Sequence, residues 1–127
     1  LKVNEGSVYD DLTTTYGQFP FVTSCEVVEH LYSPRDFAKT LFDLVQPSGY
    51  AIITTPYHGY FKNLAIALLG KMDSHFTALW DHGHIKFFSK NTIELLLTEA
   101  GFESCNFDFA GRFPPLQKSM IIICKKK

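Results

Sequence analysis

The chain has 127 residues, of which 46% are hydrophobic and 20% are charged. This is the composition of a compact soluble domain and excludes a disordered or fibrous segment. The 12 Lys plus Arg residues and 13 Asp plus Glu residues leave a net charge of -1, so the basic surface that nucleic-acid binding requires is missing. The longest nearly continuous apolar run, 64–69, falls far short of the roughly 20 residues of a membrane-spanning helix. We therefore expect neither a nucleic-acid partner nor a membrane span.

The cysteine pattern gives a first indication of cellular location. Cys25, Cys105 and Cys124 lie far apart, are odd in number and form no CxxC pair. This pattern argues against a disulfide framework and against a zinc site. We therefore expect free thiols and a cytoplasmic location.

The first half of the chain alternates between strand and helix signals. Residues 19–25 form an apolar run that predicts a short buried strand. Ser33 suits the N-cap of a following helix and Pro34 its first position, while 47–49 (Pro-Ser-Gly) end it. Residues 50–55 predict a second strand, covered by helices on both faces of a parallel sheet. Strand, helix and strand in this order indicate a right-handed crossover unit.

Residues 60–69 have helical propensity but are apolar almost all round. Lys62 and Asn63 are the polar interruptions. Such a helix needs a covering layer, and we interpret it as a buried core helix. A substrate lid, a dimer contact and a membrane-surface patch are the alternatives.

The second half predicts one further helix and a hairpin. Ser89 can cap a helix that ends at Gly101. Residues 102–109 alternate between apolar and polar positions and 120–124 are fully apolar, so both segments read as strands. The loop between them carries Gly111, Pro114 and Pro115.

Four motifs in this order carry a family resemblance. They are Gly6-Ser7-Val8-Tyr9-Asp10, Ser24-Cys25-Glu26-Val27-Val28-Glu29-His30-Leu31, Gln46-Pro47-Ser48-Gly49-Tyr50 followed by Thr54-Thr55-Pro56, and His84-Ile85-Lys86-Phe87-Phe88-Ser89 leading to Glu99-Ala100-Gly101-Phe102. Together they resemble the class I S-adenosylmethionine-dependent methyltransferases, in particular the ubiquinone O-methyltransferase type. The resemblance implies an α/β fold: a partial Rossmann-like methyltransferase sheet, mostly parallel, with a C-terminal antiparallel hairpin.

The resemblance also implies a set of cofactor-binding residues. Ligands of such folds sit beyond the carboxyl ends of the strands. The segment matching Ser7 and Val8 closes over the adenine of S-adenosylmethionine, with a side-chain acceptor that is usually Asp and here is Ser7. A serine accepts without charge assistance, and Ser7 can also be read as a plain turn residue. Ser24, Cys25 and Glu26 would line the methionine part.

A cluster of potential metal ligands follows the first strand. Glu26, Glu29 and His30 stand at i, i+3 and i+4 and would share one face of a helical turn. Two carboxylates and an imidazole can hold a divalent cation, and some quinone-type O-methyltransferases are thought to activate a catechol oxygen in this way. The other interpretation, which we favour, is that Glu29 and His30 pair with each other or with a nearby amide and that no metal binds.

The loop Trp80-Asp81-His82-Gly83-His84 lies over the substrate by resemblance. We predict His84 as the base that takes a proton from a small-molecule acceptor. Alignment alone can also support methyl transfer, and a histidine that only orders the loop is the other alternative. His58 and His75 offer no basis for a role.

The glycine-rich turn of class I enzymes is missing from these 127 residues, since no GxG occurs among the 8 glycines. The resemblance therefore implies that residues 1–127 form one partial domain, from the third strand to the C-terminus, with an insert near 60–70. Three explanations stay open: a piece of a longer methyltransferase, a truncated non-catalytic binding module, or a homodimer whose copies cover each other's open sheet edge.

Overall fold

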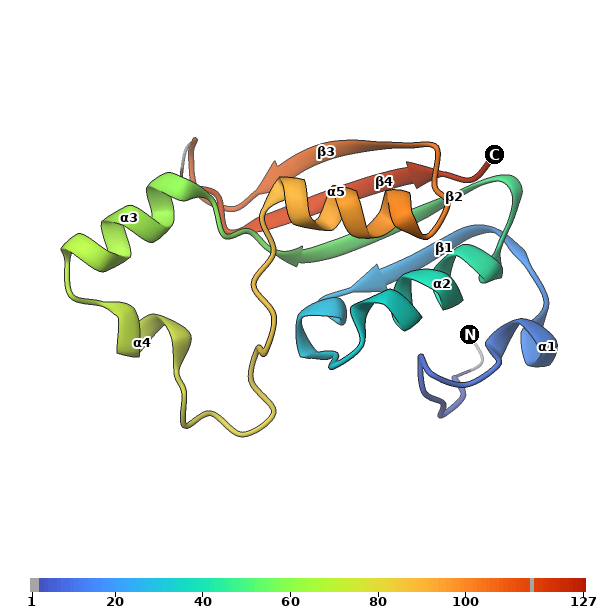
Figure 1. The fold of residues 1–127 in the computed structure, drawn as a ribbon, viewed down its shortest axis with the longest axis horizontal. Coiled ribbons are helices and arrows are strands. Elements are labelled where there is room, and N and C mark those ends of the chain that lie inside the picture. The colour runs from blue at the N-terminus through green and yellow to red at the C-terminus, as the bar shows by residue number, and fades with distance from the viewer. Residues whose placement is uncertain (1–2, 115) are drawn as a thin grey trace.

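The computed structural model describes residues 3–114 and 116–127. Its described residues form one sheet of four strands in the order β1-β2-β4-β3 (Figure 1). The strands are β1 (Phe19–Cys25), β2 (Val45–Pro56), β3 (Ser104–Ala110) and β4 (Ser119–Lys125). β1 and β2 are parallel, and β4 is antiparallel to both of its neighbours. The predicted strands and the C-terminal hairpin are confirmed. The prediction that 19–25 is a buried strand is wrong, because β1 lies at an edge of the described sheet and Ser24 is its one buried residue. The third strand is expected at the start of the chain, where residues 1 and 2 lie outside the described ranges and residues 3–11 form no strand. Pro115 also lies outside the described ranges.

Two helices, α2 (Pro34–Leu44) and α5 (Lys90–Glu99), cover the same face of the sheet. Their buried side chains and alternate residues of the strands make up the core: Val28, Phe37, Leu41, Ala51, Ile53, Ile93, Leu97, Phe102, Met120 and Ile122, among others. On the opposite face Tyr50 is 36% and Ile123 is 38% exposed. The prediction that helices cover both faces is therefore wrong for the described residues.

The sequence signals at the helix ends are largely confirmed. Pro34 occupies the first turn of α2, although the Ser33 side chain makes no capping bond; its backbone N–H instead donates to Tyr9 Oη at 3.2 Å. Ser89 forms a capping box with Thr92 at the start of α5. Gly101 follows α5 with a φ of 112°, a conformation that glycine adopts at little cost.

The turn predicted at 47–49 is a bulge inside β2. Phe19 pairs with Val45, and Phe21 already pairs with Tyr50, so the residues between Val45 and Tyr50 loop out of the ladder. Ser48 within this loop has a φ of 65°. The helix thus ends at Leu44, earlier than 47–49, and β2 begins before the predicted strand.

The expectation of free thiols at Cys105 and Cys124 is wrong. The two residues face each other in the β3–β4 ladder with a Cα–Cα distance of 4.2 Å, and they form a disulfide. Distance along the chain was a poor guide, because a hairpin brings residues far apart in sequence into register. Cys25 is free and exposed.

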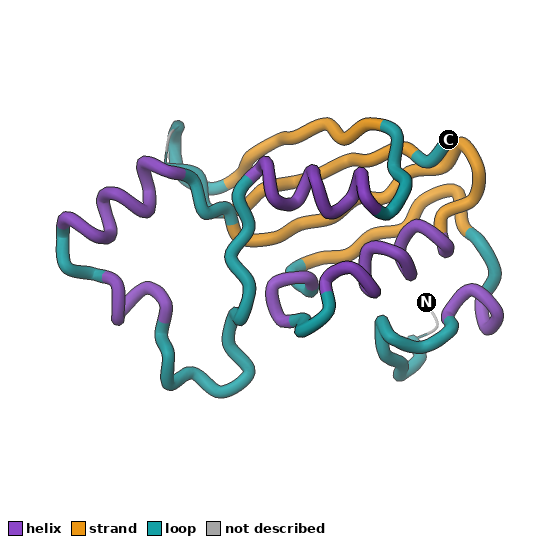
Figure 2. The backbone as a smooth tube through the Cα atoms, in the orientation of Figure 1, coloured by secondary structure: helices purple, strands orange, loops and turns teal. Residues whose placement is uncertain are grey.

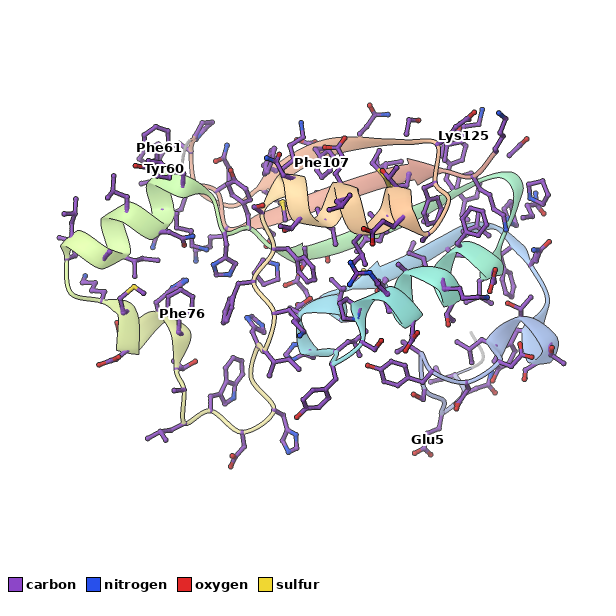
Figure 3. The ribbon with its side chains drawn as sticks, in the orientation of Figure 1. Glu5, Tyr60, Phe61, Phe76, Phe107 and Lys125 are labelled. Atoms are coloured by element: carbon purple, nitrogen blue, oxygen red, sulfur yellow. A yellow bond between two sulfur atoms is a disulfide. The ribbon has the colours of Figure 1, made fainter. Side chains whose placement is uncertain are left out.

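The predicted buried helix at 60–69 is exposed. α3 (Tyr60–Leu68) and the short α4 (Met72–Phe76) contain no buried residue. They project from the end of the sheet, and a long loop leads back to α5 (Figure 2). Tyr60 and Phe61, 73% and 61% exposed, extend from the first turn of α3 on the side away from α4 (Figure 3). The covering layer that this apolar helix needs does not come from the described part of the chain. No helix in that part is long and apolar enough to cross a bilayer.

Candidate functional site

The carboxyl ends of β1 and β2 lie at one edge of the sheet, where the polar motifs converge. Glu26 follows β1 with a φ of 53°, and its backbone N–H donates to Thr54 O at 3.1 Å. A 3-10 turn, η1 (Val28–His30), comes next. The predicted single helical turn from Glu26 to His30 is therefore wrong, since Glu26 lies ahead of the turn in a left-handed conformation.

The Glu29 carboxyl group is buried, with 1% of the residue exposed. Its Oε2 accepts from the Thr55 hydroxyl at 3.1 Å, and its Oε1 has no hydrogen-bond partner in the described structure. Burial raises the pKa of this carboxyl above its usual value, because the charged form loses its hydration. A buried carboxyl oxygen without a partner is available to a proton, a cation or a ligand.

The tautomer of His30 follows from its neighbours. Its Nδ1 lies 3.0 Å from His82 O and 3.2 Å from Gly83 O. Carbonyl oxygens only accept, so Nδ1 carries the hydrogen and the neutral ring presents a lone pair at Nε2. That Nε2 is 4.0 Å from Glu29 Oε1, which is beyond hydrogen-bond distance, so the pairing of Glu29 with His30 stays a prediction.

The loop with the histidine motif packs onto this turn. The backbone N–H groups of Ile85 and Lys86 both donate to Glu29 O at 2.9 Å. A side chain on Gly83 would come within 3.0 Å of Trp80, so glycine permits this close turn. The loop is thereby fixed with His84 next to His30, at a ring-centroid distance of 4.8 Å.

Glu29, His30 and His84 bring their ligand-type atoms within 4.8 Å of one another. The cluster predicted from sequence had Glu26 as its third member; the geometry among the described residues puts His84 there. Burial and the neighbouring His30 lower the pKa of His84, so its imidazole is neutral near pH 7 and can accept a proton. The donor set also fits a divalent cation, because the His30 Nδ1–H bond to a carbonyl is the usual support of a ligating imidazole.

Two further groups lie where cofactor contacts were predicted. Ser7 and Val8 line a cavity of about 310 Å³ together with Leu12 and Tyr16. The Ser7 hydroxyl accepts from the Tyr9 N–H at 3.2 Å, as a turn residue would, and keeps its own O–H for donation. The Ser24 hydroxyl near the end of β1 is buried without a partner among the described groups. Cys25 and Glu26 are exposed beside it.

The structure adds residues that the sequence interpretation passed over. His58, Lys62 and His75 line a cavity that His84 also reaches. A usable signal exists for His58, which lies two residues beyond the carboxyl end of β2, where ligand contacts concentrate. Lys62 and His75 belong to the α3–α4 segment. The sequence does not indicate that they line the cavity, because this depends on how that segment folds back toward the sheet.

Comparison with known proteins identifies the family. A family model described as a methyltransferase domain matches residues 2–105. The chain belongs to the methyltransferase domain family. This methyltransferase domain is 32% identical over 87 residues to the ubiquinone biosynthesis O-methyltransferase of Ruegeria pomeroyi, an alignment that covers 68% of the chain and 35% of that relative.

Solved structures show the same fold. An O-methyltransferase family protein from Burkholderia thailandensis superposes with a TM-score of 0.69 at 17% identity, covering 98% of this methyltransferase domain and 35% of that chain. Human N-acetylserotonin methyltransferase, solved in complex with SAM, gives a TM-score of 0.64 at 12% identity and covers 97% and 33%. The fold class expected from the motifs is confirmed, and the chain spans about a third of the length of these proteins.

Proposed function

We propose that the protein containing this chain transfers a methyl group from S-adenosylmethionine to a small-molecule acceptor. The observation that carries the proposal is the meeting of the turn after β1 with the His84 loop, within 4.8 Å, in a chain of the methyltransferase domain family. S-adenosylmethionine supplies the electrophilic methyl group. The residues of this chain hold the cofactor edge, orient the acceptor and receive its proton.

The cofactor contacts are assigned to two places. Ser7 and Val8 line a cavity of about 310 Å³, which suits the adenine edge. The unpartnered Ser24 hydroxyl, with Cys25 and Glu26, suits the methionine part at the carboxyl end of β1. The Ser33 backbone N–H donates to Tyr9 Oη at 3.2 Å and ties the Ser7 turn to the start of α2.

We assign His84 as the base. Its lowered pKa keeps it neutral, so it can take the proton that a hydroxyl or amine loses as the methyl group arrives. A cation bound by Glu29, His30 and His84 would occupy the lone pair of the His84 imidazole that a base uses to accept the proton. His84 therefore cannot act as a metal ligand and as a base at once, and we favour the base. We also propose a cytoplasmic location, where the Cys105–Cys124 pair would be reduced.

The test measures cofactor binding and turnover separately. Calorimetry should show micromolar binding of S-adenosylmethionine, and His84→Ala should leave that affinity nearly unchanged while lowering turnover on the order of 100-fold, the scale of general-base catalysis. Added EDTA should have no effect. Unchanged turnover in His84→Ala would remove His84 from the mechanism, and loss of activity with EDTA would assign the cluster to a cation. If the protein containing this chain is folded and binds no cofactor, that result would favour the non-catalytic binding module.

A further inference from the structure

A cavity of about 240 Å³ lies between the end of β2 and the α3–α4 segment. Its volume is just below the roughly 300–1,000 Å³ of sites for drug-sized ligands, so it suits a single-ring compound. His84 lines it and connects it to the cluster with Glu29 and His30. It is therefore placed to hold the group that reacts at His84.

The walls of this cavity are aromatic. The Phe76 and Phe87 rings meet edge to face at 4.8 Å, and the His58 ring meets Phe87 at 4.9 Å. Trp80 completes the lining. Phe76 comes from α4, on the inner side of the projecting segment (Figure 3). Flat rings at such angles favour a flat, aromatic occupant.

The cavity also holds a cation that lacks a counter-ion. Lys62 is partly buried, and its Nζ donates to Tyr57 O at 2.8 Å. An ammonium group has three hydrogens to donate, and no carboxylate of the described residues pairs with it. Burial, with Lys118 and Arg112 nearby, lowers the pKa of Lys62. A partly buried ammonium in positive surroundings favours an anionic partner.

Two imidazole nitrogens at the cavity are unpaired as well. His58 Nδ1 and His75 Nε2 are buried without a hydrogen-bond partner in the described structure. The His58 residue is 8% exposed. Such groups usually have a partner, and an oxygen-bearing ligand would supply one. These two groups line the same cavity as Lys62, so each could donate an N–H to an oxygen of a bound carboxylate.

We propose that this cavity binds a small aromatic carboxylate, with the carboxylate on Lys62 Nζ and the ring packed against the Phe76 and Phe87 side chains. That this compound is the acceptor of methyl transfer rests on the proposed function. Its binding does not, because the described residues that line the cavity come from β2, the loop after it, the α3–α4 segment and the loop that leads back to α5, and no cofactor contributes to the cavity.

Trp80 lines the cavity and is the 1 tryptophan of the chain, so its fluorescence reports binding directly. We expect benzoate to bind roughly tenfold more tightly than the neutral benzamide, the size of one charge-assisted hydrogen bond. Lys62→Met should abolish this preference and Lys62→Arg should retain it. Lys71→Met, an exposed lysine of the same segment, is the matched control and should behave as the wild type.

Equal affinities of the wild type for benzoate and benzamide would overturn the proposal, and this comparison requires no variant. A preference that survives in Lys62→Met, with circular dichroism showing the native fold, would also overturn it. The benzoate binding measurement uses no cofactor, so a failure of methyl transfer would not change its outcome. Conversely, a protein that methylates only neutral acceptors and does not bind benzoate would contradict the proposed carboxylate ligand. The proposed function would then still stand.

Discussion

The His58 imidazole is buried against the Phe76 and Phe87 rings. Burial, with the nearby Lys62 ammonium and His75, lowers its pKa to about 4 from 6.5. The unfolded chain therefore binds a proton at His58 between these two pH values and the folded chain does not. The stability due to the neutral ring is present above pH 6.5 and is lost as the pH falls toward 4.

We expect His58→Gln to weaken the acid sensitivity of folding. Each unit of pKa difference corresponds to about 1.4 kcal/mol, so the wild type should lose on the order of 3 kcal/mol more than His58→Gln between pH 7 and pH 4. Urea unfolding across this range measures the difference. His82→Gln alters an exposed imidazole and should follow the wild type. Parallel stability curves for the wild type and His58→Gln would contradict the shifted pKa.

At the level of single residues, the sequence predicts only part of the candidate site. Glu29 and His30 were found because they are neighbours after a strand. His84 was named as a base but not as their neighbour, since the two backbone bonds to Glu29 O that place its loop are invisible in sequence. Glu26 was grouped with them on an assumed helical spacing, which its φ of 53° breaks.

Among the elements, those with capping and turn signals were predictable. α5 is bracketed by Ser89 and Gly101, and its bounds follow from backbone chemistry that operates locally. α3 was assigned the wrong environment because hydrophobicity alone does not say what covers a helix. The pairing of Cys105 with Cys124 was missed because it depends on hairpin register, which composition does not encode.

The disulfide should stabilise the hairpin measurably. The two cysteines are separated by 19 residues, and closing a loop of that size contributes about 3 kcal/mol in the chain-entropy account. Reduction should lower the free energy of unfolding by about this amount. Equilibrium unfolding with and without a reductant measures the change.

Cys25 provides the control for this experiment. It is free and exposed, so Cys25→Ser should lose as much stability on reduction as the wild type. Alkylation before reduction should modify Cys25 and spare the other cysteines. Equal stability in both redox states, or alkylation of every cysteine before reduction, would show that the pair is not bonded in solution.

At the scale of the whole molecule, the sheet has an open edge at β1. In the described residues β1 pairs on one side only, with β2. Phe19 is 42% and Phe21 64% exposed, and Phe21 stacks on Tyr50 at a centroid distance of 5.9 Å. An edge with unpaired backbone groups beside apolar side chains is a template for association with another strand. The exposed β1 edge agrees with the open sheet edge expected from the sequence. We therefore propose that two copies of the chain can pair through it.

We expect the 127-residue chain to self-associate through this edge. Sedimentation velocity should show a weight-average mass that rises with concentration, and Phe21→Lys should shift the chain toward monomer because a lysine at an edge opposes strand pairing. The substitution should cost the fold on the order of 1 kcal/mol, since it removes the stack of Phe21 on Tyr50. Leu79→Lys is the matched control, because Leu79 is 98% exposed on the loop far from β1 in the chain. If Leu79→Lys disperses the assembly and Phe21→Lys does not, the contact lies on the projecting segment. If the chain is a monomer at every concentration, the prediction that it self-associates through the β1 edge is wrong.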